Sequence, residues 1–442
     1  MTGLSEAAWE SPLEAIERAV QERAKDLALD VAGPAAREEL RRLVGDEIER
    51  WHSDYRRGQR SFDLAEAERT AERALRNLVG YGPLQPLLED PDVWEIEVNA
   101  PDAIFVRRHR GDSGYHDEVF HDDDHVTRVL TKILDDAGRS HRKLDPAEGL
   151  QDAQLDTGAR LHIVHSDIGR DGHTLVNVRK FTGLRLRTLA ELVGRDMLDH
   201  AAAGLLRACV RAGLSVLIAG PPGSGKTTLL SCLTAELDPA LRVVIAEEVF
   251  ETDCDLPNVA HMQTRPARAD RPAVDLRRLV AGFLRMAPDV AIVGEVRDRE
   301  AMPLLLTLSS GVQGFTTIHA GSARQALSRL RFVAALSDSR ELTLPALSAL
   351  VSEAIDVVVH CCRIDGVPRV DEVVAIEDLA VSAESVAFTT TTLFDRPRRH
   401  SPLVWSGNFP VRAGRALELA GVDVRSVLGA DAAVPEAVGG RR

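Results

Sequence analysis

The stretch GPPGSGKT, Gly220 to Thr227, decides the fold of this chain. It follows the apolar run Ser215–Ala219 and precedes a segment of helical character, Thr228–Leu237. Its spacing fits the pattern GxxxxGK[ST], in which backbone N–H groups at the start of a helix cradle phosphate. The sequence therefore predicts a nucleoside triphosphate site, with a strand before the loop and a helix after it.

The residue types of this loop have separate tasks. Glycines let the backbone turn its N–H groups inward, and Lys226 supplies a positive charge for the β- and γ-phosphates. The hydroxyl of Thr227 is a hard oxygen ligand that suits Mg²⁺. We expect ATP and Mg²⁺ as cofactors. The residues expected to contact the nucleotide are Gly220, Pro221, Pro222, Gly223, Ser224, Gly225, Lys226, Thr227 and Thr228.

Composition excludes several classes of protein. With 442 residues, 44% hydrophobic and 28% charged, the chain predicts a soluble globular protein of more than one domain. No apolar run reaches the roughly 18 residues of a membrane span, and the acidic start is unlike a secretion signal, so we expect a cytoplasmic protein. The net charge of −14 argues against a stable nucleic-acid partner. The five cysteines lack zinc-site spacing and are expected to be free thiols: Cys209, Cys232, Cys254, Cys361 and Cys362.

Changes of pattern along the chain predict four segments. Residues 1–77 form a helical N-terminal extension, in which Leu13, Ile16 and Val20 have helical spacing. Residues 78–183 form a small α/β domain, 184–380 a larger α/β domain and 381–442 a C-terminal tail. A helix over Leu64–Val79 is expected to end at Gly80, before turns in 81–88.

Strands alternating with helices in the larger domain predict a parallel sheet with helices on both faces. One predicted helix, Asp275–Met286, places Leu276, Leu279, Val280, Phe283 and Leu284 on one face. The cluster Arg396–Arg399 in the tail is expected to be a solvated loop. The predicted strands are Trp94–Val98, Ile104–Arg107, Leu161–Val164, Leu175–Val178, Arg242–Ala246, Val290–Val293, Gly314–Ile318 and Val357–His360, and a helix is expected over Val126–Ala137.

Polar residues at the ends of three of these strands supply candidates for catalysis. Glu295 follows an apolar strand and is expected to orient the attacking water and support the metal together with Thr227. Glu247 and Glu248 close the strand RVVIAEE, and His319 closes GFTTIHA. Ligands of parallel α/β sheets bind at this carboxyl edge. A surface glutamate and a structural histidine remain the alternatives.

Four motifs in order resemble the Walker A, Asp-box, Walker B and His-box series of secretion ATPases. They are GPPGSGKTTLL, AEEVFET (Ala246–Thr252), LRMAPDVAIVGEVRD (Leu284–Asp298) and GFTTIHAGS (Gly314–Ser322). The pair Gly294-Glu295, in place of Asp-Glu, is part of the resemblance. Within this superfamily the chain looks most like the CpaF/TadA group that drives tight-adherence (Flp) pilus assembly, with matching segments from Leu78 to Ile376.

The resemblance implies an α/β fold with a RecA-like P-loop NTPase domain, preceded by a smaller α/β N-terminal domain. It implies ATP hydrolysis by a homohexameric ring at the inner face of the cytoplasmic membrane. Its partners would be integral inner-membrane platform proteins of a pilus or secretion system.

Roles for individual residues follow from the same resemblance. Glu295 is the Walker B glutamate, Glu247 and Glu248 lie in the Asp box, and His319 is the His-box histidine. Arg160 and Arg179 stand where the family supplies arginines that reach the nucleotide. In departures from the pattern, Val312 replaces a usual histidine and Gln154 a common arginine, and the tetracysteine module of type II secretion ATPases is absent.

Two other functions fit a phosphate loop. A RecA-like core also serves motors driven by nucleic acid, such as helicases and conjugation ATPases, and these are stimulated by DNA or RNA with a steep salt dependence. A nucleotide switch or scaffold would bind ATP without hydrolysing it.

Overall fold

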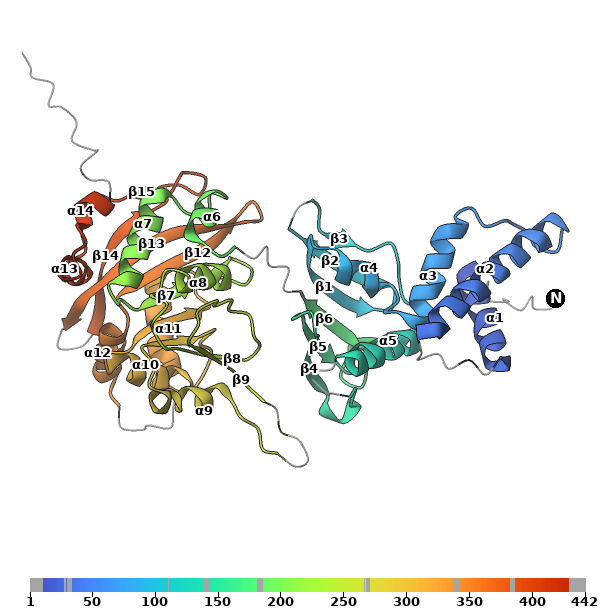
Figure 1. The fold of residues 1–442 in the computed structure, drawn as a ribbon, viewed down its shortest axis with the longest axis horizontal. Helices are drawn as coiled ribbons and strands as arrows, with labels where there is room; N and C mark the ends of the chain where they lie inside the picture. Colours follow the sequence, from blue (N-terminus) through green and yellow to red (C-terminus); the bar gives the residue numbers. More distant parts are fainter. Residues whose placement is uncertain are drawn as a thin grey trace, which may run out of the picture. The chain divides into compact units, whose positions relative to one another are not determined.

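The chain divides into two units, Met1–Thr182 and Gly183–Arg442 (Figure 1). The computed structural model describes residues 11–27, 29, 34–109, 111–137, 143–180, 186–265, 267, 271–336, 342–381 and 386–428. Residues 1–10 of the expected helical extension and 429–442 of the expected tail lie outside the described residues. Among the helices that are described, none is long and apolar enough to cross a lipid bilayer.

The first unit begins with three helices, α1 (Pro12–Asp26), α2 (Pro34–Arg56) and α3 (Ala67–Val79). Ser11 starts α1 through a reciprocal capping box with Glu14, and α3 ends at Gly80 as the sequence predicts. The apolar residues expected on one face of α1 are buried in a core with residues of α2 and α3. The periodicity of this segment is therefore confirmed.

A six-stranded antiparallel sheet completes the first unit, in the order β3-β2-β1-β6-β5-β4. Helices α4 (Leu84–Glu89) and α5 (Asp123–Asp136) pack on one face of it. The turns expected in 81–88 are partly wrong, because Leu84–Glu89 is helical. Strands β3 and β4 were not expected. The strands are β1 (Val93–Ala100), β2 (Ala103–Arg108), β3 (Gly114–Tyr115), β4 (Leu150–Gln154), β5 (Arg160–Val164) and β6 (Leu175–Arg179).

The second unit is built on a nine-stranded sheet, in the order β15-β14-β13-β12-β7-β11-β10-β8-β9. The six strands from β12 to β9 are parallel, and five of them were expected. Strand β9 was not expected, nor were β13 to β15, which extend this sheet with antiparallel pairing. The strands are β7 (Val216–Ala219), β8 (Val243–Glu247), β9 (Val259–Gln263), β10 (Val290–Val293), β11 (Gln313–Ile318), β12 (Val357–Ile364), β13 (Val367–Val381), β14 (Val386–Asp395) and β15 (Val404–Trp405).

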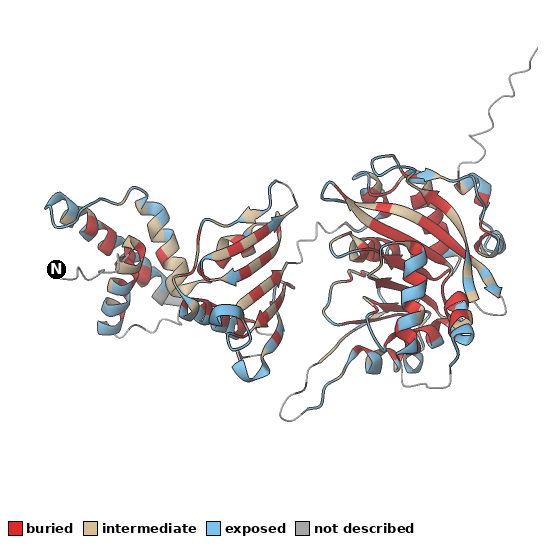
Figure 2. Cartoon of the chain, turned by 180° about the vertical axis from the view of Figure 1, so that it is seen from behind, coloured by how far each residue is buried: buried red, intermediate tan, exposed pale blue. Residues whose placement is uncertain are grey.

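Helices cover both faces of this sheet, and Figure 2 shows its buried strands between the helix layers. The doubly wound α/β fold predicted from the sequence is confirmed. On one face lie α6 (Leu189–Val193), α7 (His200–Arg211), α8 (Lys226–Thr234), α13 (Arg412–Leu419) and α14 (Val424–Val427). On the other lie α9 (Leu276–Val280), α10 (Ala301–Ser309), α11 (Ala323–Ala335) and α12 (Leu344–Ala354).

One local prediction in the second unit is wrong, and another holds except at one residue. The helix expected over Asp275–Met286 breaks after Val280 and resumes as a 3₁₀ turn, Phe283–Met286, so Leu284 is exposed rather than on the buried face. In the cluster Arg396–Arg399, Arg396 is half-buried, and its side chain donates to the carbonyls of Val370 and Ser401, at 2.7 Å each. Pro397, Arg398 and Arg399 are exposed, as expected for a solvated loop, and only Arg396 is held against the folded unit.

Candidate active site

The phosphate loop leaves β7 at Gly220, whose φ of 150° lies in a region that favours glycine. A Cβ at this position would lie 2.2 Å from the backbone oxygen of Cys361 on β12. Only glycine can therefore start the loop beside this strand. On the other side, the Gly220 N–H donates to the carbonyl of Ile318, at the end of β11 (3.2 Å).

Lys226 lies buried inside the loop at the start of α8. Its Nζ donates to the carbonyl of Pro221 (2.9 Å) and lies 3.3 Å from Nδ1 of His319. Ser224 is fully buried, and its Oγ has no hydrogen-bond partner among the described residues. Thr227 and Thr228 are half-buried in the first turn of α8. The loop is thus folded around a lysine whose ammonium group contacts the protein itself.

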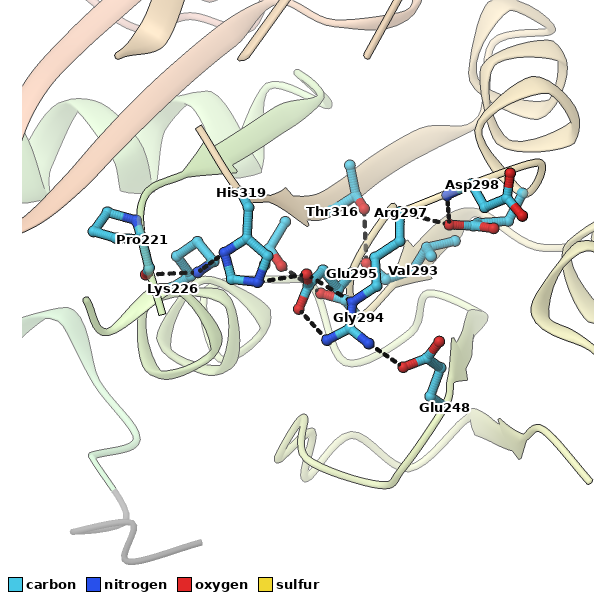
Figure 3. A network of polar contacts seen from close by, with 12 residues as sticks. Pro221, Lys226, Glu248, Val293, Gly294, Glu295, Arg297, Asp298, Thr316 and His319 are labelled. Carbon is cyan, nitrogen blue, oxygen red and sulfur yellow. Dashed lines mark hydrogen bonds and ion pairs between the residues drawn. The ribbon is translucent and has the colours of Figure 1, made fainter. Parts of the chain in front are cut away.

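The spatial order of the strands brings the predicted site residues together. Strands β7, β11, β10 and β8 are neighbours and run parallel, so their carboxyl ends share one edge of the sheet. Lys226 follows β7, His319 follows β11, Glu295 follows β10, and Glu247 and Glu248 lie at the end of β8. Figure 3 shows Lys226, His319, Glu295 and Glu248 in one network.

Glu295 is at the centre of this network. Its Oε1 lies 2.8 Å from Nε2 of His319, and its two oxygens lie 2.9 and 3.0 Å from Nε and Nη2 of Arg297. Burial raises the pKa of Glu295, but the hydrogen bonds from His319 and Arg297 outweigh this effect and hold the pKa well below its usual range. The carboxylate therefore stays ionised. A carboxylate with such a low pKa is a weak base, better suited to orienting a water molecule than to removing a proton from it.

Glu247 occupies the space beside Gly294. It is buried, and its Oε1 accepts hydrogen bonds from the N–H (2.9 Å) and hydroxyl (2.7 Å) of Thr252. Its Oε2 is buried without a partner among the described residues. A Cβ at position 294 would lie 2.9 Å from Cγ of Glu247, so the glycine makes room for this carboxylate. Burial raises the pKa of Glu247. Glu248, in contrast, is exposed and paired with Arg297.

Arg160 and Arg179 lie in the first unit, on neighbouring strands β5 and β6, where they are direct partners in the register. Both are half-buried, on the sheet face opposite the core formed by Leu161 and Val178. Arg179 is also the register partner of Glu95 on β1, so two arginines and a carboxylate lie in one row across three strands. Gln154, the departure noted in the sequence, is the partner of Arg160 on β4.

The motif interpretation missed Arg297, although the residue stands in the GEVRD segment. Its position two residues after the candidate glutamate was the available signal. Val312, the other departure, packs partly buried against the core of the second unit. The predicted roles of the site residues stay predictions.

The donor set fits Mg²⁺ bound together with a nucleotide. No group of three or more His, Cys, Asp or Glu side chains that could hold a metal ion is present in the described part of the chain. Mg²⁺ prefers a few protein oxygens together with water and phosphate. The hydroxyl of Thr227 and the unpartnered Oε2 of Glu247 are oxygens of this kind.

Comparison with protein families identifies one for this chain. A family model described as "Type II/IV secretion system protein" matches residues 77–371. A putative conjugal transfer protein of Mycobacterium tuberculosis is 33% identical over 298 residues, which cover 65% of this chain and 81% of that protein. The type IV secretion system protein PtlH of Bordetella pertussis is 32% identical over 302 residues, covering 62% and 87%.

Two solved structures are also similar. The VirB11 ATPase of the Brucella suis type IV secretion system, in complex with sulphate, is 26% identical, with a TM-score of 0.35, and covers 66% of this chain and 94% of that chain. The pilus retraction motor PilT with bound ADP is 16% identical, with a TM-score of 0.46, and covers 70% and 81%. From the family match and the relatives, this chain belongs to the type II/IV secretion system protein family, as an ATP-hydrolysing enzyme.

Proposed function

We propose that this chain is the ATP-driven motor of a tight-adherence (Flp) pilus or of a related protein-export machine. It would work in the cytoplasm, at the inner face of the cytoplasmic membrane, with integral inner-membrane platform proteins as partners. Support for the pilus assignment comes from the motif resemblance over Leu78 to Ile376.

One observation carries the proposed mechanism: a continuous polar network crosses the ends of four neighbouring parallel strands. It consists, in order of contact, of Lys226, His319, Glu295, Arg297 and Glu248. A nucleotide at the phosphate loop would attract the ammonium group of Lys226 toward the β- and γ-phosphates. Lys226 would then leave its present partners, the Pro221 carbonyl and His319. His319 would then respond to the γ-phosphate through Nδ1, while its Nε2 contacts Glu295.

Glu295 and Glu247 have different roles in this proposal. Glu295 orients the attacking water, because its carboxylate stays ionised and stands beside His319. Of the two Asp-box glutamates we assign Glu247 to the site, because only its carboxylate is buried with an oxygen left for a ligand. Mg²⁺ would be held by Thr227, by Oε2 of Glu247, by Glu295 through a water, and by the phosphates, and would neutralise their developing charge.

The substitution Glu295→Gln tests this mechanism. It keeps the size of the side chain and removes its charge, so ATP binding is expected to persist while kcat falls by at least about 100-fold. Fluorescent-nucleotide titration measures binding, and phosphate release measures turnover. Unchanged turnover in this variant would remove Glu295 from the mechanism.

The motor is proposed to act as a ring of six copies. Large apolar side chains are exposed on α10, on and just after α11, and at the start of α12, which is consistent with a surface that another copy covers: Leu306, Phe332, Leu336 and Leu344. The pair Arg160 and Arg179 would bind phosphate in the assembled motor. Hydrolysis per subunit should then rise with protein concentration, as sedimentation shows larger assemblies.

A second candidate function is a conjugation motor acting with DNA, because the Mycobacterium tuberculosis relative is named a putative conjugal transfer protein. Adding DNA decides between the two functions. A conjugation motor hydrolyses ATP faster with DNA and loses this gain as salt rises. A pilus motor of net charge −14 is expected to be indifferent to DNA.

A further inference from the structure

Arg297 lies between two carboxylates at the edge of the parallel sheet (Figure 3). Its Nε and Nη2 donate to the two oxygens of Glu295, at 2.9 and 3.0 Å, and its Nη1 donates to Oε2 of Glu248. Three different donor atoms of one guanidinium therefore serve two glutamates.

The register of the strands explains why these glutamates meet at one arginine. Val293 of β10 pairs with Ala246 of β8, and each glutamate follows its strand two residues beyond this pair. Two carboxylates at equivalent positions on neighbouring strands repel each other. A planar guanidinium has the fork geometry that binds both at once, which the single ammonium group of a lysine does not have.

The backbone of Arg297 is fixed independently of these contacts. Its N–H and that of Asp298 (2.8 Å) both donate to Oε1 of Glu300, a carboxylate that is buried before α10. The position of the arginine is thus set by its own turn. From this backbone position the exposed side chain of Arg297 reaches both glutamates.

We propose that Arg297 is a positioning residue of ATP hydrolysis, which fixes the carboxylate of Glu295 from one side while Glu248 anchors the other end of the guanidinium. The proposal rests on the role proposed above for Glu295. It gives Glu248 a task distinct from that of Glu247: Glu248 holds the arginine, and Glu247 faces the ligand.

Four variants test the proposal, with Arg278→Gln as the matched control because Arg278 is an exposed arginine on α9 of the same unit. In Arg297→Gln, kcat is expected to fall by about 10- to 100-fold, since a misplaced catalytic group costs this order of rate. Nucleotide affinity should change by less than about twofold, because the loop itself is untouched. Arg297→Lys should recover part of the rate, and Glu248→Gln should lose less than Arg297→Gln. The double variant Glu295→Gln with Arg297→Gln should be no slower than Glu295→Gln alone, because the arginine acts through Glu295.

Three outcomes would overturn the proposal: a normal kcat in Arg297→Gln, a loss of nucleotide affinity equal to the loss of kcat, or a further fall in rate when the substitution is added to Glu295→Gln. If thermal melting shows that Arg297→Gln is unfolded, the same criteria apply to Arg297→Lys. Normal turnover in Glu295→Gln would instead defeat the proposed function. An inactive Glu295→Gln together with an active Arg297→Gln defeats only the present inference.

Discussion

At the scale of single residues, the site contains a glutamate whose ionised form is disfavoured by burial in the folded chain. Glu247 is buried and keeps one oxygen without a partner among the described residues. Burial raises its pKa, so the unfolded chain loses this proton at a lower pH than the folded chain does. Ionised Glu247 therefore reduces stability above its unfolded pKa, and protonated Glu247 does not.

Replacing Glu247 by glutamine is expected to raise the free energy of unfolding of the second unit at neutral pH. The amide oxygen still accepts the hydrogen bonds of Thr252, and no buried charge remains. The gain over the unaltered protein should shrink as the pH falls toward about 4, where the glutamate is protonated. Urea denaturation at several pH values measures it, and ATP hydrolysis should fall in the same variant. A variant less stable than the parent at pH 7 would contradict this.

The sequence predicted these residues better than their contacts. Motif order placed Glu295, Glu247 and His319 at strand ends; the structure pairs His319 with Glu295 (Figure 3) and places Glu247 beside Gly294. Arg297 could not be assigned in the same way, because its role depends on β8 and β10 being neighbours. Chain order alone does not show that β11 lies between β7 and β10.

At the scale of elements, buried runs were predicted well and irregular ones poorly. Strands such as Val290–Val293 are apolar throughout, whereas β9 and β4 carry polar residues and gave no pattern. The break after Val280 was hidden because a 3₁₀ turn also directs Phe283 into the core. The spacing of apolar residues indicates which side chains are buried, but it does not show where the backbone hydrogen bonds of an α-helix stop.

Helix α1 contacts the segment before α5 in the first unit through a titratable side chain. His121, just before α5, lies 2.8 Å from Glu17 and 3.3 Å from Glu14, and Asn77 of α3 donates to Glu17 (2.7 Å). The hydrogen bond to Glu17 raises the pKa of His121, against the opposing effects of burial and of Arg73. His125 stacks on the same ring, and burial lowers its pKa to about 3.

This contact should stabilise the attachment of α1 at mildly acidic pH. A raised folded pKa gives stability that is complete below the unfolded value of about 6.5 and is lost as the pH rises through the folded pKa. Hydrogen exchange of α1, corrected for intrinsic rates, should show more protection in the unaltered chain than in His121→Gln at about pH 6. The difference should disappear in alkaline solution. Because folded His125 has a pKa of about 3 and stays neutral over this pH range, a difference that grows with pH would contradict the assignment to His121.

At the scale of the whole molecule, the residues after the matched family region complete the second unit. Strand β14 extends the sheet, and the buried residues Leu393, Phe394 and Leu417 join the core formed by α7 and β7. Residues 381–442 were expected to form a tail because they contain no recognisable motif. Several of their apolar side chains are nevertheless buried in the core of the second unit. Their contribution is to cover one face of the motor unit.

Two leucines of α13 allow a matched test. Leu417 is fully buried, and Leu419 is 83% exposed. Leu417→Ala is expected to lower the free energy of unfolding of the second unit by about 2–5 kcal/mol, because it leaves a cavity. Leu419→Ala should stay within about 0.5 kcal/mol of the parent. Chemical denaturation of both variants makes the comparison. Equal effects of the two substitutions would show that this segment does not contribute to the core.

The closeness of β12 to the phosphate loop also limits how the sequence can evolve. A side chain at position 220 would meet the backbone oxygen of Cys361, an atom that every amino acid at position 361 supplies. No second substitution in β12 can remove that oxygen. Random mutagenesis should therefore yield suppressors for side-chain clashes, such as the one between a side chain at position 314 and Leu308, and none for Gly220.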